Sequence, residues 1–305
     1  MGDANIVTPL MNQAYVTLIE TRYEAVRKLE AALKKYNVGE YRSALSICDA
    51  IFHYDAQFCD NLVLLGAVHY QLHDLDLSIY YSELCLRIHP NCFEALSNFG
   101  NALCQIERYT DAIAAHHRAI RESSRSGSAY NNLAVTYMCT GEIEEAIKTY
   151  NVALFLDTSC SQVLSNLGNA YAAVGKMKDA KRCYKDAIKN NNCVISRSSL
   201  ADVLSEINEF DDAIFQYGQA ISLAPDYVEA QCNYGKLVLE RLKYSDVVLL
   251  DDLEKIEEKL RVITLERPDN SAAQINFGIC LYHKGFIDFA KEKFQAAKVL
   301  NPYDS

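Results

Sequence analysis

Asparagine is the side chain whose spacing in this sequence points to chemistry. An amide both donates and accepts hydrogen bonds, so a column of asparagines on one helix face is suited to hold the backbone of an extended polypeptide. The same residues also fit an ordinary polar helix face, and the pattern alone does not choose between the two. Five asparagines share one position of a repeat and two lie three residues further on: Asn98, Asn132, Asn166, Asn233 and Asn276, then Asn101 and Asn169.

Small residues that recur at nearly constant intervals set this repeat. Successive intervals are 33 or 34 residues, except for one of 43, and the positions are Ala32, Gly66, Gly100, Ala134, Gly168, Ala201, Gly235 and Gly278. A second small residue follows twelve positions later in most copies, as at Ala112 and Ala180, and Pro90 and Pro225 close their units at a common position. This is the tetratricopeptide period and pattern.

The repeat predicts an all-α fold, a right-handed superhelical α-solenoid of about eight tetratricopeptide helix pairs. Small residues let the two helices of a pair approach closely, and no pair buries its apolar face alone, so we expect the pairs to stack into one elongated array. The predicted units are 25–58, 59–92, 93–126, 127–160, 161–193, 194–227, 228–270 and 271–304. Residues 1–24 are expected to be a leading helical segment.

Two parts of the array depart from the regular unit. The seventh unit carries an insertion at about 236–255, and we expect its second helix across about 251–265. The last helix, "FAKEKFQAAKVL", has apolar residues on more than one side, so we expect the array to continue past Ser305. The role of the insertion and the presence of a catalytic domain beyond Ser305 do not follow from the sequence.

Composition narrows the function classes. The chain has 305 residues, a formal net charge of −10 and no basic block, which argues against a nucleic-acid or anionic-membrane partner. Eleven cysteines form no C-x-x-C pair and no N-x-S/T sequon occurs, which favours reduced thiols in the cytosol or nucleus. No metal ligand set and no cofactor motif stands out.

Catalytic patterns are missing as well. The sequence has no G-x-G-x-x-G, no P-loop, no H-E-x-x-H and no G-x-S-x-G. We place the carboxylates on outer helix faces and corners, and His116 and His117 on a second helix as surface or packing residues. Catalysis within these 305 residues is therefore not expected.

One stretch is more specific than the repeat. "DNLVLLGAVHYQLHDLDLSI" at 60–79, followed by "LRIHPNCFEALSNFGNAL", resembles the N-terminal tetratricopeptide region of O-linked N-acetylglucosamine transferases, in particular the plant-type SECRET AGENT members. The corner "YQLHDLD" is distinctive, because the generic repeat does not require Gln71, His73 or Asp74. The resemblance implies a nucleocytoplasmic glycosyltransferase whose repeats select protein substrates, with the asparagine column gripping their backbone and a homodimer possible. Ser199 and Leu64 interrupt that column.

The alternative is a scaffold or adaptor subunit of a multiprotein assembly with no link to glycosylation. A co-chaperone that grips a carboxyl-terminal tail would carry a basic residue just before the asparagine position. That position instead holds Ser97, Asn131, Ser165, Ser198, Cys232 and Ile275. A chaperone tail is therefore disfavoured, whereas a scaffold role and an enzyme's substrate-binding region both stay open.

Overall fold

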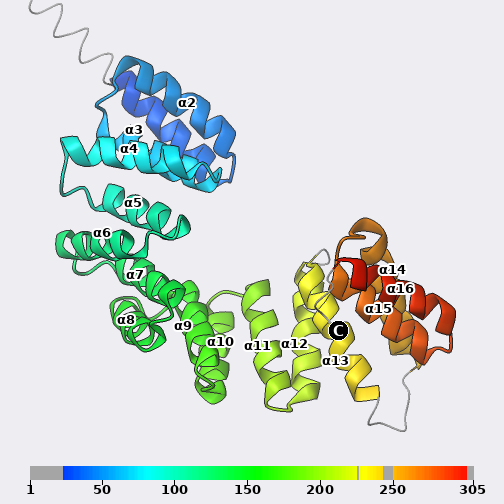
Figure 1. Cartoon of the computed structure of the whole chain (residues 1–305). Coiled ribbons are helices and arrows are strands. Elements are labelled where there is room, and N and C mark those ends of the chain that lie inside the picture. Colours follow the sequence, from blue (N-terminus) through cyan, green and yellow to red (C-terminus); the bar gives the residue numbers. More distant parts are fainter. Residues whose placement is uncertain (1–22, 225–226, 243–249, 301–305) are drawn as a thin grey trace, which may run out of the picture. The chain divides into compact units, whose positions relative to one another are not determined.

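The computed structural model describes residues 23–224, 227–242 and 250–300, and every regular element among them is a helix. The predicted all-α solenoid of helix pairs is confirmed (Figure 1). By its contacts the chain divides into two compact units, residues 1–158 and 159–305, which are described separately. The leading helix expected before residue 25 lies outside the described residues, apart from its last two positions.

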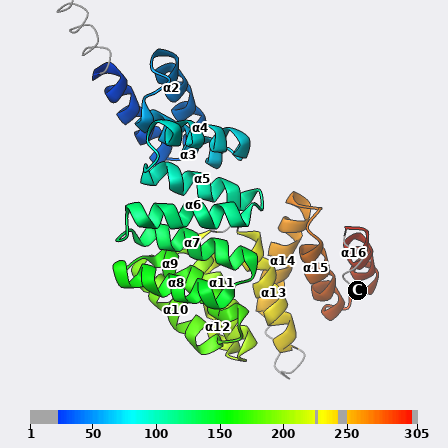
Figure 2. The ribbon, with the colours of Figure 1, turned by 60° about the vertical axis from the view of Figure 1, so that its left-hand side comes forward.

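The first unit contains four helix pairs that follow one another along the chain (Figures 1 and 2). The first helix of a pair is called helix A and the second helix B. Each pair packs on the next, and the A helices α3, α5 and α7 also contact one another in order. The helices are residues 23–37, α2 (Tyr41–Tyr54), α3 (Cys59–Gln71), α4 (Leu75–Ile88), α5 (Phe93–Gln105), α6 (Tyr109–Glu122), α7 (Gly127–Thr140) and α8 (Ile143–Leu156).

The second unit repeats the arrangement. The seventh pair of the chain is the irregular one, because α13 and α14 are longer than the other helices of this unit. The insertion expected at about 236–255 falls partly on these two helices and partly outside the described residues. The helix expected across 251–265 is α14. The helices are α9 (Ser161–Ala173), α10 (Met177–Asn190), α11 (Val194–Glu206), α12 (Phe210–Leu223), α13 (Val228–Leu242), α14 (Leu250–Glu266), α15 (Ser271–His283) and α16 (Ile287–Leu300).

The small residue on helix A faces the side chain sixteen positions later on helix B. A Cβ atom at Gly168 would lie 2.7 Å from the Tyr184 ring, and one at Gly278 would lie 2.6 Å from the Phe294 ring. At Gly66 the facing group is smaller, because the nearest atom is the Ser82 hydroxyl at 2.9 Å. At Gly168 and Gly278 any side chain would therefore overlap the facing ring. In two other pairs the small residue opposite a tyrosine is alanine, at Ala134 and Ala201.

The helix B residues that face the small residue of helix A differ from pair to pair in whether their polar atoms are hydrogen-bonded. Tyr184 donates its hydroxyl hydrogen to Oδ1 of Asn169, and Tyr217 donates to Asp202 in the same register. His116, which faces Gly100, is 1% exposed, and neither of its ring nitrogens has a hydrogen-bond partner. Burial, with a smaller contribution from His117, lowers the pKa of His116 to about 4.

In every helix pair whose turn lies within the described residues, that turn contains a residue with positive φ. Glycine occupies it at Gly39, Gly141, Gly175 and Gly285, whereas His73, Glu107 and Asn208 adopt φ of 60–63°. At Glu107 its own N–H donates to Cys104 O and the Arg108 N–H donates to Leu103 O, which is a Schellman closure of α5. The positive φ is a property of the corner and is imposed on three residues that are not glycine.

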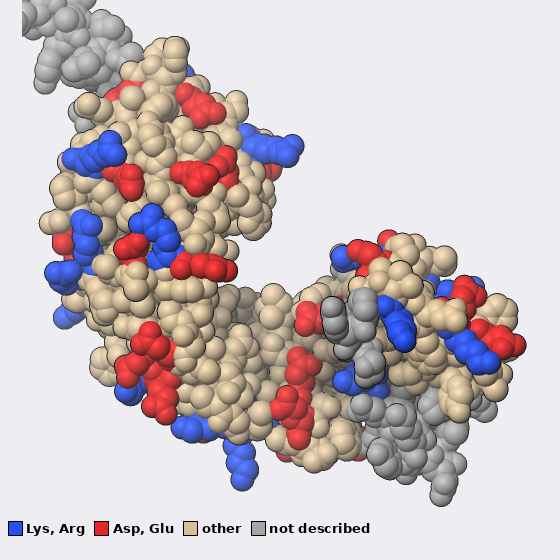
Figure 3. All heavy atoms as spheres, in the orientation of Figure 1, with Lys and Arg blue, Asp and Glu red and all other residues tan. Residues whose placement is uncertain are grey.

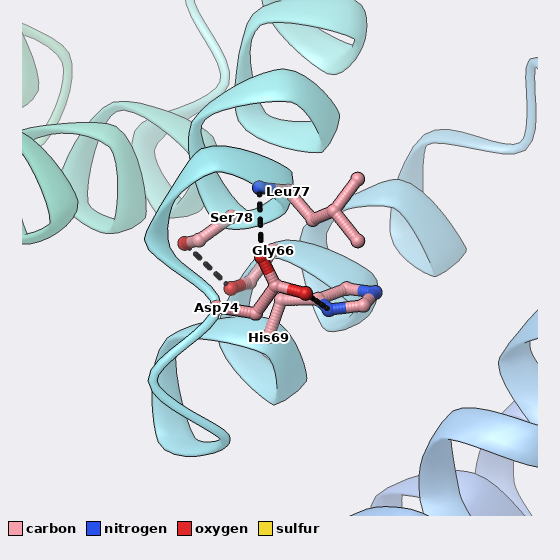
Figure 4. A network of polar contacts seen from close by, with 5 residues as sticks. All are labelled: Gly66, His69, Asp74, Leu77 and Ser78. Carbon is pink, nitrogen blue, oxygen red and sulfur yellow. Dashed lines mark hydrogen bonds and ion pairs between the residues drawn. The ribbon is translucent and has the colours of Figure 1, made fainter.

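The distinctive corner of the second pair has its own polar network (Figure 4). Asp74 caps α4 by accepting from the Leu77 N–H at 3.5 Å, and its other oxygen lies 3.7 Å from Nδ1 of the buried His69. Ser78 donates to the Gly66 carbonyl at 2.8 Å, which ties α4 to α3. Asp74 thus has a local structural role, as an N-cap and as a neighbour of His69.

The surface of the described residues carries both charged and apolar side chains. On the face shown in Figure 3, acidic and basic side chains are interspersed. In the described part of the chain, no helix is both long and apolar enough to cross a membrane. On α16, Phe289 is 62% exposed and Val299 80% exposed, so apolar side chains do lie on the outer side of the last described helix.

Candidate peptide-binding groove

A groove of about 270 Å³ runs across the A helices of the first unit. It is lined by residues of the helix at 23–37, α3, α5 and α7. Its wall is largely apolar, with contributions from Leu33, Val63, Leu64 and Phe93. Because consecutive A helices each present the same turn to this surface, the groove crosses several repeats, as a site for an extended ligand must.

The lining residues follow a simple spacing on each A helix. Glu94 and Asn98 on α5 lie one helical turn apart and both line the groove, as do Asp60 and Leu64 on α3 and Ser128 and Asn132 on α7. Residues four apart share a helix face, so the asparagine position and the position four before it form two parallel rows. The second row was missed in the sequence, where we placed the carboxylates on outer faces and corners. Asp60 and Glu94 correct that placement, and counting four residues back from the asparagine position was the available signal.

Asn98 contributes to packing as well as to the groove. Its Nδ2 donates to the Val63 carbonyl of the preceding A helix at 3.0 Å. In the second unit Asn276 makes the equivalent bond, from Nδ2 to the Cys232 carbonyl at 2.9 Å, and is only 6% exposed. At these two positions one amide hydrogen therefore joins successive A helices.

Asn132 is differently placed. Its Oδ1 accepts from the Asn131 amide at 3.4 Å, while its own Nδ2 donates to no other group among the described residues. It lines the main groove and also a second hollow of about 220 Å³, which includes Asn101 and Tyr70. The structure thus brings three of the predicted residues, Asn98, Asn101 and Asn132, to one surface of the first unit.

The remaining predicted residues lie in the second unit and have structural partners. Asn166 accepts from Gln162 Nε2 at 3.2 Å, and the exposed Asn169 accepts from the Tyr184 hydroxyl. Asn233 donates to Asp202 Oδ1 at 3.1 Å and lines a hollow of about 310 Å³ with it. Burial raises the pKa of the Asp202 carboxyl, and the hydrogen bonds from Tyr217 and Asn233 oppose that shift. A role for any of the seven asparagines in peptide binding stays a prediction.

Among the described residues there is no group of three or more His, Cys, Asp or Glu side chains arranged to hold a metal ion. What the surface provides is apolar contact, amide groups and two carboxylates, which are the elements of non-covalent recognition.

Comparison with known proteins agrees with this fold. A tetratricopeptide-repeat family model matches residues 98–159 and 165–228. The Caenorhabditis elegans UDP-N-acetylglucosamine–peptide N-acetylglucosaminyltransferase is 34% identical over 79 residues, which are 26% of this chain and 7% of that protein. The human DnaJ homolog subfamily C member 7 is 24% identical over 222 residues, 68% of this chain and 43% of that protein. The chain thus spans less than half the length of these relatives.

Two solved structures have the same fold at low identity. YrrB, described as a tetratricopeptide protein with an unusual peptide-binding site, has a TM-score of 0.51 at 22% identity and covers 62% of this chain and 94% of its own. PilW, a type IV pilus biogenesis factor, has a TM-score of 0.61 at 16% identity and covers 68% and 96%. With residues 98–159 and 165–228 matched and the helix pairs in place, the chain contains tetratricopeptide repeats.

Proposed function

We propose that this chain binds an extended polypeptide segment in the groove of its first unit. The observation that carries the proposal is the set of lining residues, which come from four successive A helices and include the amides of Asn98 and Asn132. An extended segment lying across those helices would exchange backbone hydrogen bonds with the amides and place side chains against Leu33, Val63 and Leu64.

The charge of the groove indicates which segment fits. Asp60 and Glu94 line it, and no lysine or arginine stands among the residues that do. Opposite charges across an interface steer association and suppress wrong partners. The preferred segment therefore carries lysine or arginine beside an apolar side chain.

A binding measurement tests this proposal. Fluorescence anisotropy of a short unstructured peptide in which valine alternates with lysine should show saturable binding, and a counterpart with glutamate in place of lysine should bind weakly. Glu94→Lys should weaken the lysine peptide by a factor of roughly ten or more, about 1.4 kcal/mol per decade.

Asp76→Lys is the matched control for that measurement. Asp76 lies exposed in the first turn of α4, away from the groove, and its replacement changes the net charge by the same amount. This variant should bind like the parent. Equal weakening by the two substitutions would mean that the peptide responds only to the overall charge of −10, and the groove proposal would then fail.

The finer proposal is that the groove selects protein substrates for an O-linked N-acetylglucosamine transferase active in the cytosol and nucleus. Its support is the resemblance of residues 60–103 and the 34% identity to the C. elegans transferase, whose name specifies a peptide acceptor. The second candidate is an adaptor, supported by the DnaJ homolog, which matches 68% of this chain.

The full-length natural protein distinguishes these two candidates. A transferase should move N-acetylglucosamine from the UDP-sugar to a groove-binding peptide that contains serine, and a tagged copy should be found in the cytosol or nucleus. An adaptor should bind the same peptide without modifying it. Binding without transfer by the full-length protein would contradict the glycosyltransferase proposal and leave the groove proposal standing.

A further inference from the structure

The row of groove residues that lies four positions before the asparagines has a third member, Ser128. Asp60, Glu94 and Ser128 recur at intervals of 34 residues, and each is the second residue of its A helix, on α3, α5 and α7. All three line the groove. The row is therefore acidic on two successive A helices and carries a neutral hydroxyl on the third.

Ser128 is the accessible serine of this groove. It is exposed, and its hydroxyl lies 2.8 Å from Ser126 Oγ, a bond within the same corner. Ser126 in turn caps α7 by accepting from the Ala129 N–H at 3.4 Å. Ser97 also lines the groove, but its Oγ is buried and has no hydrogen-bond partner among the described residues. An enzyme that modifies a serine of the groove from solvent therefore reaches Ser128.

The segment before Ser128 has the charge pattern of a kinase substrate. Residues 121–128 read "RESSRSGS", so Arg125 stands three residues before Ser128, as Arg121 does before Ser124. Both arginines are exposed. Protein kinases choose their substrates partly by such charge patterns, because a basic residue ahead of the acceptor pairs with acidic groups of the kinase. Helix ends fray, so the first turn of α7 opens more readily than the helix interior and can present its serine.

We propose that Ser128 is a phosphorylation site for an arginine-directed serine kinase, and that its phosphate extends the acidic row of the groove onto α7. In the reaction the Ser128 hydroxyl oxygen attacks the γ-phosphorus of ATP. A new O–P bond forms, the bond from that phosphorus to the β,γ-bridging oxygen breaks, ADP leaves, and the hydroxyl proton passes to the base of the kinase. This inference rests on the proposed binding function of the groove, which the modification regulates.

The added charge suits both the helix and the ligand. A phosphoserine carries about −1.5 to −2 charges at neutral pH, and the N-terminus of α7 favours an anion through its first N–H groups and its dipole. Packed helices lie about 8–10 Å apart, close to the screening length in about 0.1 M salt, so the repulsion from Glu94 is weak. A lysine of the bound segment that reaches the phosphate forms a charge-assisted hydrogen bond at short range. Phosphorylation therefore strengthens the binding of a basic segment.

Site-specific incorporation of phosphoserine tests the effect on binding. Chains with phosphoserine at position 128 and, as the matched control, at position 124 are compared with the unmodified chain by anisotropy of the peptide of alternating valine and lysine. Ser124 is exposed and does not line the groove. Phosphate at position 128 should lower the Kd roughly tenfold in low salt and less in high salt, whereas phosphate at position 124 should leave the Kd nearly unchanged.

Treatment of the folded, unaltered chain with the catalytic subunit of cyclic-AMP-dependent protein kinase and MgATP tests access to the site. Trypsin cleaves after Arg125 and so separates Ser124 from Ser128, and fragmentation of the second peptide distinguishes Ser126 from Ser128. We expect phosphate on Ser128 and a gain in peptide affinity on treatment. The gain should persist in Ser124→Ala and vanish in Ser128→Ala, each compared with its own untreated chain.

The outcomes separate this inference from the proposal on which it rests. If the unmodified chain binds the peptide and phosphate at position 128 brings no gain, or only the gain that phosphate at position 124 brings, the role of Ser128 is wrong and the groove proposal stands. Failure of the kinase to modify Ser128 in the folded chain would also overturn the inference. If the unmodified chain does not bind the peptide, the groove proposal itself fails, and this inference fails with it.

Discussion

The second and third helix pairs, residues 59–126, differ from the next two pairs, 127–193, at the two positions that the repeat constrains most. Facing the small residue, the earlier pairs have Ser82 and His116, whereas the later ones have Tyr150 and Tyr184. In the tight turn, the earlier pairs have His73 and Glu107 with positive φ, whereas the later ones have Gly141 and Gly175.

The pairs that differ are those that line most of the proposed binding groove. The earlier pairs include α3 and α5, which supply much of the groove, and in them Ser82 Oγ and both His116 nitrogens are buried without a hydrogen bond. Departures from local rules that bring no visible gain in stability concentrate at functional sites in natural proteins. The repeat tolerates such departures because the backbone of each pair is held by the neighbouring pairs. Substitutions at four places test this explanation.

The largest expected effect is the acid sensitivity of His116. Its pKa is about 4 in the folded chain and about 6.5 in an unfolded one. Between these values the unfolded state binds one more proton, so stability is complete above pH 6.5 and falls as the pH drops towards 4. The loss at pH 4 is about 3 kcal/mol.

The control for this measurement is the His116→Tyr variant. Its tyrosine would stand opposite Asn101 in the same register as Tyr184 opposite Asn169. Urea unfolding of parent and variant between pH 7 and pH 4 should show a difference that widens by about 3 kcal/mol in favour of tyrosine. All other titrating groups are common to both chains. Parallel curves would show that His116 protonates in the folded state without cost.

The next effect compares the glycines that face the two kinds of partner. Gly168→Ala would push a methyl group into the Tyr184 ring and should cost roughly 1–3 kcal/mol. In Gly66→Ala the one short contact of the new methyl group is with the Ser82 hydroxyl at 2.9 Å, and the better helix propensity of alanine, worth up to about 1 kcal/mol, offsets that contact. Thermal melts of both variants should separate clearly. Equal losses would mean that the facing residue does not set the need for glycine.

A smaller effect separates the two asparagines of the groove. Asn98→Ala removes the bond to the Val63 carbonyl and should lower stability by roughly 1 kcal/mol, whereas Asn132→Ala should leave the melt unchanged. Each change should weaken binding of the lysine–valine peptide roughly threefold, and the double variant roughly tenfold. If the double variant binds like the parent and is folded, neither amide contacts the ligand.

The smallest effect concerns the turn. Glu107→Gly should stabilise the chain by roughly 0.5–1 kcal/mol, because glycine adopts positive φ without the clash that a Cβ atom causes. Gly175→Ala should destabilise it by a similar amount. Guanidinium unfolding of the two variants measures the change in the free energy of unfolding for each. A loss of stability in Glu107→Gly would show that the glutamate side chain itself supports the corner.

The period alone was enough for the helical character of this chain and for its solenoid class. Positions such as Gly66, Gly100 and Gly168 recur at 34 residues, and a helix pair is the unit that such a period of small and large residues builds. The positive-φ corner was also present in the sequence, since Gly39, Gly141 and Gly175 keep the same phase. Repeats make local sequence sufficient here because each unit packs mainly on its neighbours.

Tertiary structure alone decided what the polar side chains do. One asparagine position yields an inter-helix bond at Asn98, an amide nitrogen with no partner among the described residues at Asn132 and a partner for a carboxylate at Asn233. Asp60 and Glu94 face the groove because helices distant in sequence meet there. The sequence pattern determines which face of a helix a residue occupies. Whether a hydrogen-bonding group on that face is paired or unpaired depends on atoms of the adjacent helices, and their positions are set only when the pairs stack.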